Sequence, residues 1–208
     1  MKKILLILVA VIGIGINTNI YAQKEKIVLC LEELKDKWKF EDESIIIQKV
    51  INVNDISKEN LYKYLREFFI YNYGSARDVI QYDEVNETII GKGYYSKLES
   101  YGDYFDVWHI LKCEIRENRI RITLSMKEML VYDEPNAAEQ YFLGKRGVDI
   151  SKKYFVNFYP MDLSSFNKTR TQEGWVVCQS VNKALFTIIE IEKFIKNTSE
   201  RSKKQDDW

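Results

Sequence analysis

The clearest pattern in the chain is the alternation of apolar and polar residues on both sides of the dipeptide Glu117-Asn118. It predicts two strands, at residues 107–116 and 119–132, joined by a two-residue turn in which asparagine tolerates a positive φ. This register places Glu114 opposite Arg121 on the solvent side, because strand side chains alternate with period two. It also pairs apolar residues on the other side, namely Ile115 with Ile120, Cys113 with Ile122 and Leu111 with Leu124.

Other segments have the composition of regular elements. A β-branched run at residues 43–53 predicts a strand. Residues 58–71 predict an amphipathic helix, because a serine N-cap precedes apolar residues at helical spacing. Two short strands at 79–83 and 88–95 flank a loop of hairpin length. An apolar stripe over residues 175–197 predicts a closing helix.

The order of these elements is β-α-β-β-β-β-α, which predicts an α+β domain over residues 43–197. We expect one curved antiparallel sheet with two helices on one face and the other face available. Residues 23–42 form a charged lead-in segment with a weak helical stripe. Residues 134–174 are an irregular, aromatic-rich insertion, and residues 198–208 are expected to be a disordered tail.

Residues 1–22 have the layout of a secretory signal peptide. Two lysines precede an apolar run from Ile4 to Ile16, and the small residue Ala22 precedes Gln23. The run is shorter than the roughly 20 apolar residues of a membrane span. We therefore expect cleavage before Gln23 and a mature protein that is periplasmic or secreted and not integral to the membrane; an uncleaved anchor is the alternative.

Charge and cysteine content limit the classes of partner and of scaffold. The chain has 31 basic and 31 acidic residues, whereas nucleic-acid-binding domains normally carry a basic excess on one face, so we expect no nucleic acid partner. The three cysteines allow at most one disulfide within the chain. Cys113 and Cys178 have the character of small buried apolar side chains, and a partner for Cys30 stays open.

Four short runs of the chain resemble a known family: Ser57-Lys58-Glu59-Asn60-Leu61-Tyr62, Val79-Ile80-Gln81-Tyr82, Ile89-Ile90-Gly91-Lys92-Gly93 and the Glu117-Asn118-Arg119 hairpin. Together they are similar to domain of unknown function 4468, a family of secreted Bacteroidetes proteins with a fold like one repeat of the TATA-box-binding protein (TBP). The resemblance covers roughly residues 43–132 and the last helix. The chain departs from it at Asn118, where glycine is expected, and in residues 134–174. The resemblance implies a fold and supplies no active-site residues.

The sequence offers little catalytic chemistry. It contains no G-x-S-x-G, H-E-x-x-H or C-x-x-C motif, and we expect neither a metal nor a cofactor. His109 is the only histidine, and the register places it at the rim of the core. Asp103 and Asp106, with Glu99 nearby, are more typical of an acidic loop than of a calcium site. A hydrolase that uses Asp103, Asp106 and His109 is an alternative, and it requires their side chains to converge in one pocket.

A set of basic and aromatic residues falls on the sheet face opposite the predicted core: Trp108, Lys112, Arg116, Arg121 and Lys127. Tryptophan and arginine are enriched at interaction hot spots, although a merely solvated face has the same composition. Our leading hypothesis is a non-enzymatic domain that binds a peptide, a protein or an envelope component through this face or through residues 134–174. A second alternative is a self-associating envelope subunit, a homo-oligomer whose face is covered by another copy.

The signal-peptide hypothesis predicts the mass of the exported protein. The intact mass should correspond to a chain that begins at Gln23, because signal peptidase cleaves after the small residue that ends the segment. Mass spectrometry of the protein recovered from the culture medium or periplasm tests this prediction. Recovery of a membrane-bound, full-length chain would contradict it.

Overall fold

A computed structural model of the chain describes residues 24–54, 56–73, 80–83, 85, 87–134, 136–144, 150–155 and 168–205. The predicted signal peptide, residues 1–22, lies outside these residues, as do the last three residues of the predicted tail.

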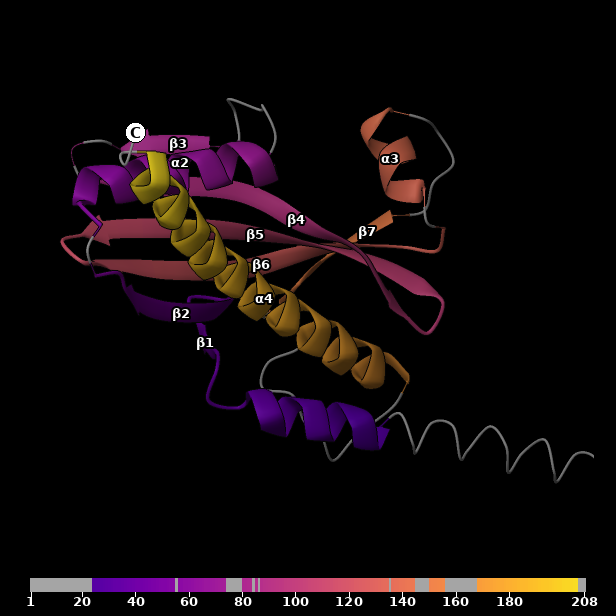
Figure 1. The fold of residues 1–208 in the computed structure, drawn as a ribbon. Coiled ribbons are helices and arrows are strands. Elements are labelled where there is room, and N and C mark those ends of the chain that lie inside the picture. Colours follow the sequence, from indigo (N-terminus) through magenta and orange to yellow (C-terminus); the bar gives the residue numbers. More distant parts are fainter. Residues whose placement is uncertain are drawn as a thin grey trace, which may run out of the picture.

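The sheet is antiparallel throughout its described pairings. A helix at residues 24–34, the N-terminal helix, comes first. The elements that follow are β1 (Lys39–Glu41), β2 (Ser44–Asn52), α2 (Lys58–Tyr73), β3 (Ile80–Asp83), β4 (Thr88–Ser100), β5 (Asp103–Arg116), β6 (Arg119–Tyr132), α3 (Ala137–Phe142), β7 (Ile150–Tyr154) and α4 (Lys168–Gln205). The strand order is β1-β2-β6-β5-β4-β3, and β7 pairs with the second half of β6 (Figure 1).

The helices α2 and α4 cover one face of this sheet, the helix face (Figure 1). Both contact β4, while α2 also contacts β5 and α4 contacts β2. The structure therefore confirms the predicted α+β class with two helices on one face. Their buried stripes supply much of the core: Leu61, Tyr64, Leu65, Phe68 and Phe69 from α2, and Val177, Val181, Ala184, Ile188, Ile191 and Ile195 from α4.

The predicted hairpin register is confirmed residue by residue. Asn118 has a φ of 57°, and the three apolar pairs face each other as expected. All six of their side chains are buried, none more than 2% exposed. On the opposite side, Arg121 donates two hydrogen bonds to the Glu114 carboxylate, at 2.8 Å from Nε and 2.7 Å from Nη2. The turn thus determines which side chains enter the core.

Two glycines in β4 allow α2 to approach the sheet closely. A Cβ atom on Gly91 would lie 2.5 Å from the Phe69 ring, and one on Gly93 would lie 2.7 Å from the Tyr73 ring. Both distances are shorter than any real packing contact, so a side chain at either position would displace α2. These glycines therefore permit the close approach of α2 to the sheet.

The strands β4 and β5 extend beyond their predicted limits and meet at the turn Tyr101-Gly102. The alternation of β4 is interrupted by a register shift between Tyr95 and Leu98, where Lys97 has a φ of 55°. Such a bulge inserts an extra residue and hides the period-two pattern on which the prediction depended.

The helical stripe of the lead-in segment is confirmed, because Ile27, Leu31 and Leu34 are buried on the helix at residues 24–34, and β1 then pairs with β2. Two other expectations need correction. The insertion at residues 134–174 contains α3, β7 and the start of α4. The tail is helical as far as Gln205, since lysine, arginine, glutamate and glutamine are good helix formers and need no apolar stripe to continue a helix.

The register predicts a strong asymmetry between the two faces of the hairpin. Replacing Leu111 or Ile122 with alanine should lower the free energy of unfolding by about 2–5 kcal/mol, whereas Glu114→Ala should lower it by about 1 kcal/mol or less. Cys113 should resist thiol reagents in the folded protein and react once it is unfolded, because its side chain is fully buried. Chemical denaturation of the three variants measures the first two values. Equal losses on both faces would contradict the register.

Candidate functional site

The candidate site is the face of the sheet opposite α2 and α4, which we call the open face. The strand pairings define it, because partners across strands point the same way. Its side chains on the central strands include Gln48, Val50 and Asn52 of β2, Lys92 and Tyr94 of β4, Trp108, Ile110, Lys112, Glu114 and Arg116 of β5, and Arg119, Arg121, Thr123 and Ser125 of β6. The edge strands contribute Lys39 and Glu41 of β1 and Gln81 and Asp83 of β3.

An aromatic cluster occupies the β4 side of the open face. The rings of Tyr94 and Trp108 pair across the strands with centroids 5.1 Å apart. Lys92 places its ammonium group 4.9 Å from the centre of the Trp108 ring, a cation–π contact. Tyr94 is 51% exposed and the neighbouring Ile110 is 46% exposed. The aromatic cluster therefore exposes apolar side-chain surface to solvent.

A basic cluster occupies the other end of the open face, near the hairpin turn. Arg116, Arg119 and Arg121 surround Glu114 and the exposed Val50, and these five residues line a depression of about 150 Å³. The pKa of the Glu114 carboxyl is lowered, chiefly by its hydrogen bond to Arg121. Glu114 is thus held ionised, yet it neutralises only part of the charge. The depression therefore has a net positive charge, and Val50 gives it an apolar surface.

The predicted face residues are brought together with one qualification. Trp108, Lys112, Arg116 and Arg121 all lie on the open face. Lys127 lies at its margin, because β6 has a bulge opposite Trp108 and the Lys127 side chain forms an ion pair with Glu43 at 2.7 Å. Sequence reasoning missed other members of the face, Val50, Lys92 and Tyr94; the pairing of β2 with β6, which was not predicted, brings in Val50.

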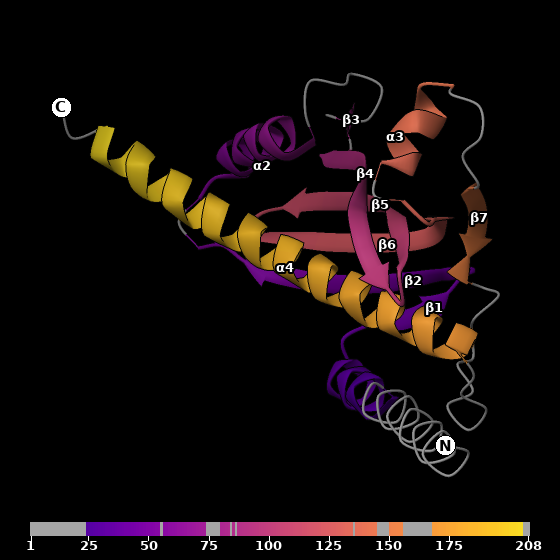
Figure 2. The same cartoon turned by 90° about the vertical axis from the view of Figure 1, so that its right-hand side faces the viewer.

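The face opposite α2 and α4 is available only in part, because α3 packs over one end of it. Tyr104 and Tyr132 stack with their ring centroids 5.9 Å apart, and Ala137 and Ile150 pack against them. Figure 2 shows α3 on the other side of the sheet from α2. The insertion thus covers the end of the sheet where β5 begins and leaves the part from Trp108 to the hairpin turn open.

Asp106 is buried at the end of the sheet that α3 covers, and its carboxylate has a structural role. Its Oδ1 accepts hydrogen bonds from the Tyr132 hydroxyl at 2.7 Å and from the backbone N–H of Lys97 at 2.8 Å. Lys97 is the residue with positive φ in the β4 bulge. Asp106 therefore joins the β4 bulge to Tyr132, on which Ala137 of α3 packs.

His109 points the other way, into the helix face. Its Nε2 is 2.9 Å from the Tyr73 hydroxyl, and its ring stacks on Tyr95 with centroids 4.3 Å apart. The Tyr95 hydroxyl in turn lies 3.1 Å from the Thr187 hydroxyl of α4. Burial lowers the pKa of His109 to about 4, and its Nδ1 has no hydrogen-bond partner among the described residues. His109 is a neutral packing residue between the sheet and both helices.

Asp103 has a third set of contacts, since its carboxylate accepts a hydrogen bond from Gln172 of α4 at 2.7 Å. Asp103, Asp106 and His109 therefore have separate partners, and Asp106 and His109 lie on opposite faces of β5. The convergence that the hydrolase alternative requires is not found among them. Within the described residues there is also no group of three or more metal-ligating side chains.

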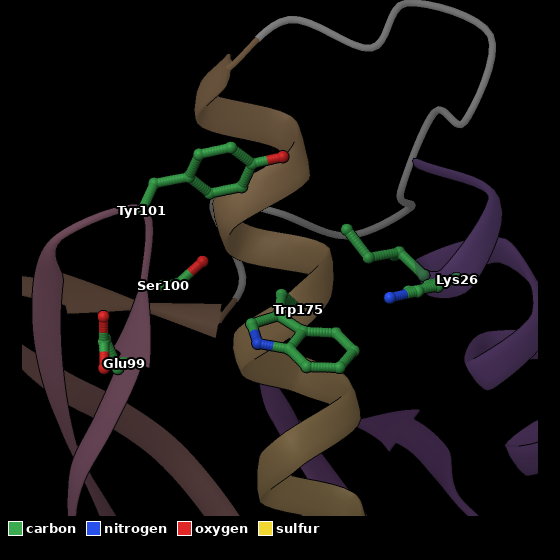
Figure 3. Close-up of a pocket in the computed structure, with 6 residues that line it drawn as sticks. Lys26, Glu99, Ser100, Tyr101 and Trp175 are labelled. Carbon is green, nitrogen blue, oxygen red and sulfur yellow. The ribbon is translucent and has the colours of Figure 1, made fainter. Parts of the chain in front are cut away.

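A second cavity lies away from the open face, between the N-terminal helix, the β4–β5 turn and α4 (Figure 3). Its volume is about 380 Å³. Lys26 approaches from one side, Glu99, Ser100 and Tyr101 from the other, and Trp175 stands between them. Sequence reasoning could not find this cavity, because its walls come from three segments that are distant in the chain.

Comparisons with known proteins give the fold. No family model and no curated protein matches the chain. A TBP-like protein from Parabacteroides distasonis superposes with a TM-score of 0.57 at 10% identity, over 76% of this chain and 97% of the other. A DUF4468 family protein from Bacteroides ovatus superposes with a TM-score of 0.51 at 14% identity, over 77% of this chain and 91% of the other. The chain has a TBP-like fold.

This TBP-like fold confirms the resemblance predicted from the sequence, and at these identities it carries no activity. In this structure α2 and α4 cover one face of the sheet, and the aromatic and basic clusters lie on the other. Among the described residues, no helix combines the length and apolar character needed to cross a membrane.

The environment of His109 predicts a pH dependence of stability. Its folded pKa of about 4 lies below the ordinary 6.5, so the unfolded chain binds the proton more readily. The stability from neutral His109 is present above about pH 6.5 and is lost as the pH falls to about 4, by roughly 3 kcal/mol in all.

Denaturation of the protein and of His109→Gln between pH 4 and pH 7.5 measures this effect. The carboxylates titrate in both proteins, so their contribution cancels in the difference between the two curves. The protein should lose more stability than the variant over this range. Parallel curves would show that His109 does not carry the dependence.

Proposed function

We propose that this protein is an exported, non-enzymatic binding module whose open face takes an acidic segment of another protein or peptide. The observation that carries the proposal is the pairing of the exposed Tyr94 with the half-buried Trp108, beside a cluster of three arginines on the same face of the sheet. Buried aromatic and arginine side chains contribute most of the binding energy in protein interfaces.

The charge of the open face favours an acidic partner. On the central strands β4, β5 and β6, between Trp108 and the hairpin turn, its cations are Lys92, Lys112, Arg116, Arg119 and Arg121, and its carboxylate is Glu114. The edge strands β1 and β3 add one cation, Lys39, and two carboxylates, Glu41 and Asp83, so that the excess stays positive. An approaching anion is steered by this excess, and the steering weakens with salt because exposed charges are screened beyond about 10 Å at 0.1 M. The exposed Val50 and Ile110 add apolar surface that a partner removes from water. The partner is therefore expected to combine carboxylates with apolar side chains.

The export part of the proposal is supported by the sequence of residues 1–22. It also bears on the identity of the partner, because a protein outside the cytoplasm meets envelope proteins and their peptides and not the chromosome. Self-association and nucleic acid binding are the competing occupants of the same face, and the experiment below separates them.

Site-specific photo-crosslinking in the producing cells tests the face directly. A photoreactive side chain at Ile110 should capture a discrete partner, whereas the same side chain at Phe186 should not. Phe186 is the matched control, because it is 54% exposed but lies on α4, which covers the opposite face. The captured band should weaken several-fold as salt is raised.

The double variant Trp108→Ala with Arg121→Ala should lose this capture while its thermal midpoint stays within a few degrees of the original, because neither side chain is in the core. Asp106→Ala and His109→Ala should keep the capture. A band of twice the chain mass would replace the proposal with self-association, and a nuclease-sensitive product would replace it with nucleic acid binding. If the double variant keeps its partner while Asp106→Ala removes a hydrolytic activity, the protein is an enzyme.

A further inference from the structure

The N-terminal helix packs tightly on the start of α4. A Cβ atom on Gly174 would lie 2.9 Å from the Ile27 side chain, so the two helices are as close as the absence of a side chain permits. Ile27, Leu31 and Leu34 are buried in this contact or next to it. Cys30 lies one turn after Ile27, and Cys178 lies one turn after Gly174. Residues three or four apart lie on the same side of a helix, so these two cysteines are also near each other.

Two thiols meet at this level of the contact. The Cys178 thiol is buried and donates a weak hydrogen bond to the backbone carbonyl of Ile27 at 3.9 Å. Cys30, one turn after Ile27, is half-buried, and its sulfur accepts a hydrogen bond from Asn182 at 3.8 Å. Asn182 is one turn after Cys178. Cys178 therefore contacts the residue one turn before Cys30, and Cys30 contacts the residue one turn after Cys178.

The electrostatics agree with direct contact between the two side chains. Burial raises the pKa of Cys178, and a hydrogen bond and the charge interaction with Cys30 raise it further. The third cysteine has a different environment, since Cys113 lies in the sheet between Ile89 of β4 and Ile122 of β6. Cys30 and Cys178 are the one pair of cysteines in position to react with each other.

We propose that Cys30 and Cys178 form a disulfide when the protein meets a disulfide oxidant, which covalently joins the N-terminal helix to α4. The half-buried Cys30 thiolate attacks the oxidant, forms a mixed disulfide and releases one thiolate. The Cys178 thiolate then attacks the Cys30 sulfur and releases the second thiolate. Two protein thiols are oxidised, one oxidant disulfide is reduced to two thiols, and the two protons from the cysteines pass to the released thiolates.

This disulfide is independent of the open face and of any partner there. It fixes one wall of the second cavity, because Lys26 and Ile27 line that cavity from the N-terminal helix and Trp175 lines it from α4 (Figure 3). It also closes a loop of nearly the whole domain, and long loops are those in which a crosslink restricts the unfolded chain most. The oxidised protein should therefore unfold about 5–15 °C above the reduced protein.

The test refolds the reduced, unfolded protein in a buffer of oxidised and reduced glutathione, so that burial does not hinder the reaction. Before alkylation, the mass should be about 2 Da below that of the thiol form. After acid quenching and alkylation in denaturant, Cys113 should be the single alkylated cysteine. Tryptic digestion should give the peptide of residues 27–35 linked to that of residues 171–183.

Matched variants give the second readout. Cys113→Ala should keep the linked peptides and the fall in thermal midpoint on addition of a reductant. Cys30→Ala should lose both while remaining folded, because Cys30 is only half-buried. The proposal is overturned if all three cysteines of the folded protein are alkylated, if the linked peptides contain Cys113, or if Cys30 links two chains.

Discussion

The Glu117-Asn118 turn is the constraint on which the rest of the structure depends. A two-residue turn admits one register, and a shift of one residue would exchange the two faces of β5 and β6. With the register observed, Leu111 and Ile122 form the floor on which α2 and α4 pack, and Trp108 and Arg121 point away from it. The core and the candidate binding surface are thus two sides of the same hairpin. A change of the turn that shifted the register would therefore disturb both.

The helix face depends on a second constraint, the lack of side chains at Gly91 and Gly93. Because α2 comes this close, Tyr73 reaches the His109 ring, which itself stacks on Tyr95. The histidine is then surrounded by aromatic rings and loses the solvent that would stabilise its charged form. A residue that looks catalytic in the sequence, as the single histidine of the chain, is in the structure part of the packing between α2, α4 and the sheet.

The sequence predicted those parts of the fold that depend on local periodicity. The hairpin, α2 and most of α4 follow from period-two and helical patterns, and so do four members of the open face. Features without a local pattern were missed. The β4 bulge at Lys97 interrupts the alternation of apolar and polar residues. The polar turns at both ends of α4 have no apolar stripe. The packing of α3 on the open face depends on contacts with Tyr104 and Tyr132, which no local pattern indicates.

Charge illustrates why a count over the whole chain says little about a surface. The chain has equal numbers of basic and acidic residues, yet the open face between Trp108 and the hairpin turn carries five cations and one carboxylate on its central strands. The edge strands add Lys39, Glu41 and Asp83, which leaves six cations and three carboxylates. The remaining surface must therefore carry the balancing negative charge. We expect this excess to steer the proposed acidic partner toward the open face before contact. The balanced composition argued against a nucleic acid partner, but the β-sheet brings basic residues from separate strands onto one face.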